Sequence, residues 1–120
     1  MISVVDDDVS VRRALKRLIR SCGFEVETFA SAQDFFAETG LQKAECIILD
    51  IHLGGMSGFE MYQKLTNNGS DVPVIFITAH DDEQTRTQAK RLGAVAYLRK
   101  PFDDQSLIDA ISTAIQKRNE

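Results

Sequence analysis

Carboxylates follow two short apolar runs in the sequence, and their positions suggest metal or phosphoryl chemistry. Asp50 comes directly after Cys46–Leu49, and Asp6 and Asp7 come directly after Ile2–Val5. Short runs that are wholly or mostly apolar predict strands buried on both faces, as in parallel sheets. Ligands of open α/β sheets bind where such strands end. Taken alone, Asp50 could equally cap a turn, so its interpretation depends on the residues that lie beside it.

Segments with the pattern of strands alternate with segments that have the pattern of helices. The expected strands are 2–5, 24–28, 46–50, 72–77 and 95–98, and the expected helices are 9–22, 31–40, 59–67, one from 81 or 82 to about 92, and one from 103 or 104. This alternation predicts a parallel sheet with helices on both faces, because each crossover is right-handed. Only residues 24–28 alternate apolar and charged residues, which places that strand at an edge. The expected fold is therefore α/β, a doubly wound, flavodoxin-like (βα)5 domain with strand order 2-1-3-4-5.

The expected strand order brings five polar side chains to one edge of the sheet. Asp6 and Asp7 lie beside Asp50, because the topological switch point falls between strands one and three. Thr78 follows the fourth strand and Lys100 follows the fifth. Three neighbouring carboxylates repel one another, and a hard divalent cation such as Mg²⁺ removes that conflict. With a lysine and a hydroxyl nearby to receive an anion, Asp50 is the candidate nucleophile toward phosphorus.

From end to end the chain resembles the receiver domain of bacterial two-component response regulators. The matching motifs are Asp6-Asp7 after strand one, Asp50 after strand three, Gly58 in the following turn, Thr78-Ala79 after strand four, and Tyr97 with Lys100-Pro101-Phe102 at strand five. The end of the chain looks most like receivers joined to LuxR-type DNA-binding domains. In this family the bond before the proline of the Lys-Pro pair is commonly cis, so the same is expected here.

The resemblance implies a phosphorylation-activated switch in a two-component phosphorelay. Asp50 would accept a phosphoryl group from the phosphohistidine of a sensor histidine kinase. Mg²⁺, with Mn²⁺ as a substitute, would be bound directly by Asp7 and Asp50, through water by Asp6, and by the backbone carbonyl of His52. The domain would catalyse its own phosphorylation and dephosphorylation without being a turnover enzyme.

The resemblance also implies how the switch works. Thr78 and Lys100 would each contact a phosphoryl oxygen. Thr78 would move inward and Tyr97 would turn into the space it leaves, which changes the surface of the fourth helix, fifth strand and fifth helix. The two histidines, His52 and His80, each lie two residues past a site residue. Either they tune the hydrolysis of the acyl phosphate, or they are solvated loop residues.

Length and composition limit the other functions that the chain could have. Its 120 residues suit one domain, a receiver over 1–120 with no output domain in this chain. A net charge of −4 and no long basic run argue against direct nucleic-acid binding. No apolar run is long enough to span a membrane, so a soluble cytoplasmic protein is expected. Cys22 and Cys46 match no metal spacing and are expected to be buried thiols.

Several partners and alternative functions remain open at this point. The output is either a DNA-binding domain in a longer chain or a separate effector, and phosphorylation could drive homodimerisation. A magnesium-dependent phosphohydrolase with Asp50 as nucleophile would need a second acid or base and a cap, neither of which is evident. A flavin-binding domain of the same fold would need backbone donors and hydroxyls for the FMN phosphate after strand one, where this chain has an acidic turn. An inactive receiver that serves as an interaction module is the last alternative.

Overall fold

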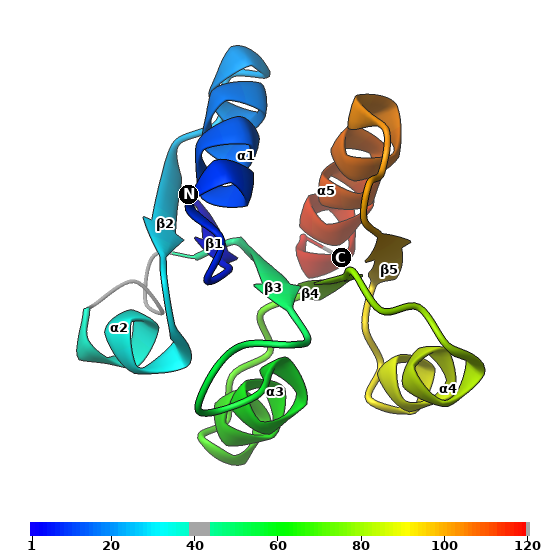
Figure 1. Ribbon diagram of the computed structural model, residues 1–120. Coiled ribbons are helices and arrows are strands. Elements are labelled where there is room, and N and C mark those ends of the chain that lie inside the picture. The colour runs from blue at the N-terminus through cyan, green and yellow to red at the C-terminus, as the bar shows by residue number, and fades with distance from the viewer. Residues whose placement is uncertain (39–43, 120) are drawn as a thin grey trace.

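A five-stranded parallel sheet with order β2-β1-β3-β4-β5 forms the centre of the computed structural model, which describes residues 1–38 and 44–119 (Figure 1). The strands are β1 (Ile2–Val5), β2 (Val26–Phe29), β3 (Cys46–Asp50), β4 (Val74–Thr78) and β5 (Ala96–Arg99), and the helices are α1 (Val9–Ser21), α2 (Ala32–Ala37), α3 (Gly58–Asn67), α4 (Glu83–Arg91) and α5 (Asp104–Arg118). The expected fold class, strand order and edge position of β2 are confirmed. No helix in the described ranges combines the length and apolar character needed to cross a membrane.

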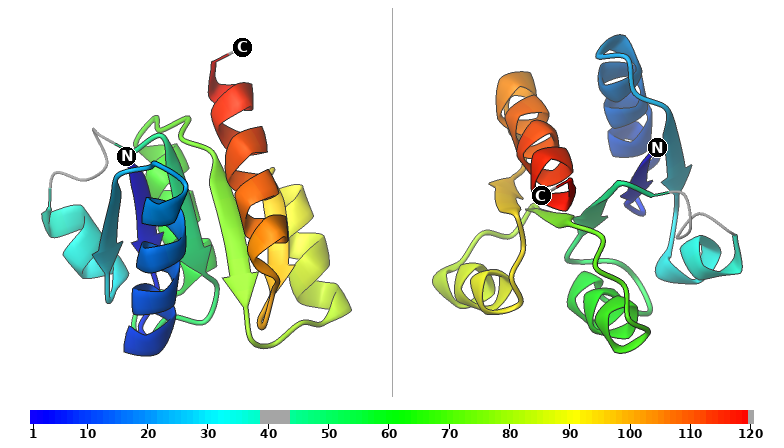
Figure 2. Two further views of the ribbon diagram at one scale, coloured as in Figure 1. Left: turned by 90° about the horizontal axis from the view of Figure 1, so that it is seen from above. Right: turned by 180° about the vertical axis from the view of Figure 1, so that it is seen from behind.

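The helices cover the sheet in two layers (Figure 2). Helices α1 and α5 pack on one face, where Leu15, Ile19 and Leu107 join the even-numbered residues of β1 and β3. Helices α2, α3 and α4 lie on the other face, where Phe35 and Met61 are fully buried. Because apolar side chains of β1, β3 and β4 point to both layers, these strands lack the polar alternation of a half-exposed sheet. The buried sheet holds the strand ends in fixed positions relative to one another.

Side-chain caps determine where the helices begin. Asp8 caps α1 by accepting hydrogen bonds from the Ser10 and Val11 amides, and it therefore turns away from the acidic group at the strand ends. Ser57 and Glu60 form the expected capping box of α3. Asp82 caps α4 and Asp103 caps α5, which decides between the neighbouring aspartates considered from the sequence. Each cap satisfies amides that have no partner inside the helix.

Helix α4 is the least anchored of the longer helices. Ala89 is its one buried side chain among the described residues, and Leu92 packs partly buried at its end. An element with little buried apolar surface belongs to the less stable part of a fold, which makes α4 free to move at small cost.

Some boundaries and one cysteine differ from the expectations. Strand β2 begins at Val26 instead of residue 24, because the Phe24 amide bonds the Ile19 carbonyl and closes the end of α1. The expected end of α2 at Gly40 lies outside the described residues. Cys46 is buried, and its burial raises its pKa to about 12. Cys22 is exposed, so the prediction of two buried thiols was wrong: it is the C-cap of α1, at the end of the helix.

Candidate metal centre at the carboxyl edge of the sheet

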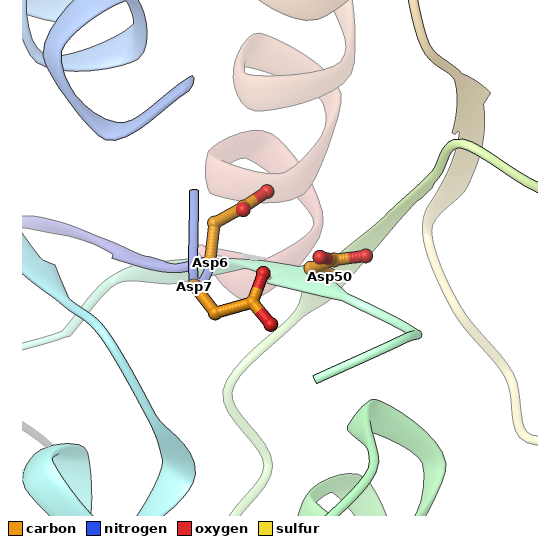
Figure 3. Close-up of side chains that lie close together, drawn as sticks. All are labelled: Asp6, Asp7 and Asp50. Carbon is orange, nitrogen blue, oxygen red and sulfur yellow. The ribbon is translucent and has the colours of Figure 1, made fainter. Parts of the chain in front are cut away.

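Three aspartates meet where β1 and β3 end. The two strands pair in register with Val5 opposite Leu49, so the residues that follow them emerge side by side. The nearest carboxylate oxygens of Asp6, Asp7 and Asp50 all lie within 4.8 Å of one another (Figure 3). Asp6 is fully buried, Asp50 is 4% exposed and Asp7 is exposed. The structure therefore brings together the carboxylates that the strand pattern predicted to converge.

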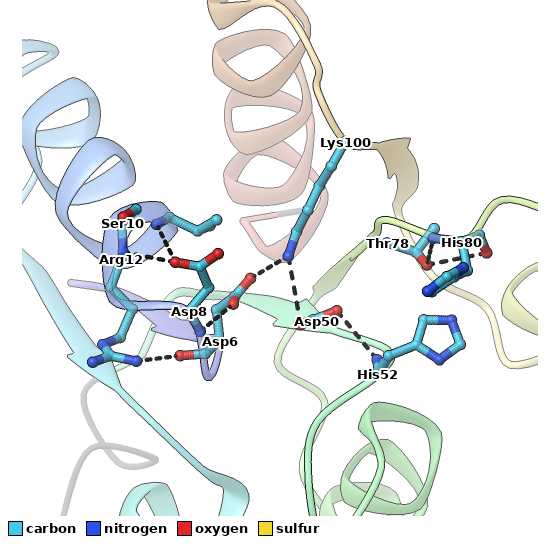
Figure 4. A network of polar contacts seen from close by, with 10 residues as sticks. Asp6, Asp8, Ser10, Arg12, Asp50, His52, Thr78, His80 and Lys100 are labelled. Atoms are coloured by element: carbon cyan, nitrogen blue, oxygen red, sulfur yellow. Dashed lines mark hydrogen bonds and ion pairs between the residues drawn. The ribbon is translucent and has the colours of Figure 1, made fainter.

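The β1–α1 loop is held in place by bonds to Asp6. The Asp8 amide donates to Asp6 Oδ1 at 2.9 Å, and Arg12 Nη1 donates to the Asp6 backbone carbonyl at 2.8 Å (Figure 4). Arg12 lies in the helix expected over 9–22, where the sequence assigned it no role. Its position one turn after the N-cap could have indicated this contact, since a helical side chain there points back toward the loop that precedes the helix.

Lys100 supplies the positive charge at this edge. Its Nζ lies 2.7 Å from Asp6 Oδ2 and 3.5 Å from Asp50 Oδ2. Burial alone would lower the pKa of Lys100, but the hydrogen bond to Asp6 and the charges of Asp50 and Asp6 outweigh it, so the pKa lies above the ordinary value. The Lys100–Pro101 peptide bond is cis, as expected. The lysine reaches the aspartates from β5 across the end of β4.

One cation does not remove the charge conflict around Asp50. Burial and, next, the charge of Asp6 raise the pKa of Asp50 above its ordinary value, and Lys100 and the His52 amide offset this only in part. Converging carboxylates with an unfavourable ionised form are the donor set that a hard divalent cation prefers. The side chains present therefore fit a magnesium ion, which Asp6, Asp7 and Asp50 would hold directly or through water.

Helix α3 packs against the backbone at the end of β3. The Gly58 amide donates to the Ile51 carbonyl at 2.9 Å. A Cβ on Gly58 would lie 2.4 Å from the Asp50 carbonyl oxygen and 2.7 Å from Ile51 Cα. Only glycine permits this approach. The resemblance singled out this glycine without giving the contact that requires it.

Thr78 and the two histidines lie across the site from Asp6. The Thr78 hydroxyl is buried, donates to the His80 carbonyl at 3.2 Å and accepts from the His80 amide at 3.0 Å. The His52 amide donates to Asp50 Oδ1 at 3.1 Å. Both imidazoles are exposed (Figure 4). Thr78 thus stands at the same edge, with its hydroxyl committed to the β4–α4 loop.

Tyr97 is tied to the start of α4 by a contact that the sequence did not indicate. Its hydroxyl donates to Asp81 Oδ1 at 3.1 Å, and Arg86 Nε lies 3.0 Å from the same oxygen. Burial and then the bond to Asp81 raise the pKa of Tyr97 to about 12. Asp81 was read from the sequence only as a possible cap. Asp82 is the cap, which leaves the neighbouring carboxylate free to hold the tyrosine.

Comparison with known proteins identifies the family. The sequence matches the family described as response regulator receiver domain over residues 2–112. The chain belongs to this family. It is 40% identical over 117 residues to Nodulation protein W of Bradyrhizobium diazoefficiens, covering 98% of this chain and 52% of that protein. It is 34% identical over 116 residues to the transcriptional regulatory protein FixJ of the same species, covering 97% of this chain and 57% of FixJ.

A solved structure agrees with this receiver domain in fold and sequence. The response regulator StyR superposes with a TM-score of 0.90 at 43% identity, covering 98% of this chain and 60% of StyR. The relatives include FixJ, so the expected likeness to LuxR-type regulators is confirmed. The chain spans about half the length of the curated relatives it matches.

Proposed function

We propose that this receiver domain is a phosphorylation-activated switch in which Asp50 accepts a phosphoryl group from a sensor histidine kinase. The observation that carries the proposal is the convergence of Asp6, Asp7 and Asp50 beside the Lys100 amine. An acceptor carboxylate needs an exposed approach and a cation to neutralise the oxygens of the transferred group. Asp50 is itself buried, but it lies at the open end of its strand beside the exposed Asp7, and this edge is the side from which a phosphoryl donor would approach.

Lys100 has two roles in this proposal. Before phosphorylation it pairs with Asp6 and, at a longer distance, with Asp50. When the carboxylate of Asp50 attacks phosphorus, negative charge moves onto the phosphoryl oxygens, and the amine stays within reach of one of them. The His52 amide keeps the acceptor oriented through its bond to Oδ1.

The carboxylate cluster supports a divalent cation as the cofactor. Asp6, Asp7 and Asp50 would hold Mg²⁺, or Mn²⁺ in its place, together with the backbone carbonyl of His52. When bound, the ion would neutralise the carboxylates and the incoming phosphoryl oxygens. Asp6 is also fixed by Asp8 and Lys100, which agrees with an indirect role in binding through water.

Two hydrogen bonds would have to change for the signal to leave the site. Thr78 would exchange the His80 backbone for a phosphoryl oxygen, and Tyr97 would leave Asp81 and turn inward. Asp81 also pairs with Arg86 on α4, so this exchange would alter the surface of α4, β5 and α5. The thin apolar anchor of α4 keeps the cost of such a shift small. We expect no change in backbone amide NMR signals from 80–100 on adding beryllofluoride if this part is incorrect.

The output and partners follow from the relatives as proposals. The transcriptional regulators that it resembles are about twice as long, so we propose a DNA-binding output, in a longer chain or through a separate effector, and a phosphorylation-dependent homodimer. A phosphohydrolase is less well supported, since His52 stands two residues after Asp50, where a second carboxylate would be the expected acid or base.

The decisive experiment is intact-protein mass spectrometry after incubation with acetyl phosphate and Mg²⁺. One added phosphoryl group that requires both Asp50 and the metal is expected, with Asp50→Asn and an EDTA-treated sample as controls. Turnover of small phosphomonoesters would favour a hydrolase instead. If no adduct forms and beryllofluoride does not bind, the domain is an inactive receiver that serves as an interaction module.

A further inference from the structure

The chain's two histidines face each other at the mouth of the acceptor site. His52 lies in the loop after β3 and His80 in the loop after β4, and both side chains are exposed. Their ring centroids are 5.3 Å apart and the ring planes meet at 86°, so the edge of one ring faces the other (Figure 4). Two exposed imidazoles on separate loops are thus within one ion's reach of each other.

We propose that His52 and His80 form a second metal site, selective for a borderline transition-metal ion and distinct from the carboxylate site for Mg²⁺. Imidazole nitrogen suits Zn²⁺, Cu²⁺ and Ni²⁺, whereas carboxylates suit Mg²⁺ and Mn²⁺. Two imidazoles that share a tetrahedral Zn²⁺ ion at Zn–N distances of about 2.0–2.1 Å have ring centres about 5 Å apart. The observed separation of 5.3 Å is close to this value. In the edge-to-face arrangement the rings must first turn about their side-chain torsions to bring one nitrogen of each toward a common ion, and both side chains are exposed and can do so.

The pair supplies two ligands and leaves the rest of the coordination sphere open. Within residues 1–38 and 44–119, Asp6, Asp7 and Asp50 are the one group of three metal-binding side chains whose ligand atoms converge. Water therefore completes the sphere in the resting domain, and a phosphoryl oxygen on Asp50 can replace one water. With two ligands, affinity depends on both imidazoles acting together, since the second binds at a high effective concentration.

A bound ion would connect the two loops that carry the switch. The His52 amide bonds Asp50 Oδ1, and the His80 backbone exchanges two hydrogen bonds with Thr78. An ion held by both rings fixes His80 beside His52 and so holds Thr78 in its resting position, bonded to the His80 backbone. This consequence rests on the proposed function: Zn²⁺ slows phosphorylation of Asp50.

Binding is tested by NMR on protein labelled only at histidine, in which two sets of imidazole signals report on the whole site. Zn²⁺ is titrated in excess Mg²⁺, in a Cys22→Ser background that removes the exposed thiol. Both imidazoles are expected to shift together at one Zn²⁺ per chain. His52→Ala or His80→Ala should weaken binding at the remaining imidazole about tenfold or more. Asp7→Asn, which alters the carboxylate cluster, should leave the imidazole shifts in place.

Two results would overturn the metal site: a shift of one imidazole alone, or equal Zn²⁺ affinity in the single-histidine variants. The regulatory consequence is measured as the rate of phosphorylation by acetyl phosphate at constant Mg²⁺, with and without Zn²⁺. Slowing by Zn²⁺ in the Cys22→Ser protein that disappears in His80→Ala supports it, and equal slowing in both refutes it. If no phosphorylation occurs under any condition, the proposed function fails while the imidazole titration still decides the metal site.

Discussion

Replacing Gly58 by alanine should move the acceptor strand and the first turn of α3 apart. The added Cβ would lie 2.4 Å from the Asp50 carbonyl oxygen, and an ordinary contact of 3.4 Å requires a shift of about 1 Å. The three nearest atoms that it meets all belong to the backbone, so no side chain can rotate away. Overpacking of this kind costs about 1–3 kcal/mol, and the lower entropy of the unfolded alanine chain returns about 0.4–1 kcal/mol. We expect a net loss of stability of roughly 1.3 kcal/mol.

The matched control is Gly54→Ala in the same turn. A Cβ on Gly54 meets nothing within 4 Å, so this variant should be as stable as the wild type or more stable by about 0.4–1 kcal/mol. Urea denaturation measures both free energies of unfolding, and thermal unfolding of Gly58→Ala should come roughly 4–8 °C earlier. Acetyl phosphate should also label Gly58→Ala more slowly, because Asp50 moves with its backbone. Equal stability of the two variants would refute the argument from close approach.

Three further predictions concern charge at the site. In Mg²⁺-free buffer at neutral pH, Asp50→Asn should raise the Tm by about 2–5 °C, since burial and Asp6 raise the pKa of Asp50 and so disfavour its ionised form. Added Mg²⁺ should reduce the difference in Tm between this variant and the wild type. A Tm below that of the wild type in Mg²⁺-free buffer contradicts the reasoning. Lys100→Met should cost roughly 3 kcal/mol by leaving both aspartates unpaired, and Mg²⁺ should stabilise it more than wild type in thermal melts. With the other tyrosine changed to phenylalanine, absorbance should show Tyr97 ionising with a pKa of about 12. Because folding raises the pKa of Tyr97 from 10, the stability that the protonated phenol contributes is present below pH 10 and is lost as pH rises toward about 12. Asp81→Asn should lower the pKa of Tyr97 only partly, since burial is the larger cause of the shift.

The sequence was sufficient to predict the sheet and the convergence at its edge. Short apolar runs that each end in a polar residue, joined by helical segments, leave few topologies, and in the doubly wound one the end of β1 must lie beside the end of β3. Asp6 and Asp50 were therefore predictable as neighbours without any structure. Strand ends were predictable only to within one or two residues, because the terminal residues of a strand can bond either to the adjacent strand or to a neighbouring helix or loop. The Phe24 amide, for example, bonds the end of α1 instead of extending β2.

The side chains that support the site were less predictable. Which basic residue of α1 reaches the β1–α1 loop depends on the rotation of the helix about its axis, and that is set by the burial of Leu15 and Ile19. Only with this rotation fixed does Arg12 reach the Asp6 carbonyl. The bond from Tyr97 to Asp81 likewise requires the position of α4, which the few apolar residues of that helix do not specify. Long-range polar contacts of this kind have no periodic signal in the sequence.

Stability and reactivity oppose each other at the carboxyl edge, and Lys100 links them. Burial and the charge of Asp6 make the ionised form of Asp50 unfavourable in the folded state, so a cation at this edge stabilises the domain. The lysine does this through its short contact with Asp6, while its longer contact leaves Asp50 less tightly paired. A divalent ion among the carboxylates would take over the neutralisation of Asp6 and free the amine for an incoming anion. Under the proposed function, the same positive charge would stabilise the unphosphorylated fold and be positioned for the phosphorylated one, so removing Asp50 should stabilise a domain that could no longer be phosphorylated.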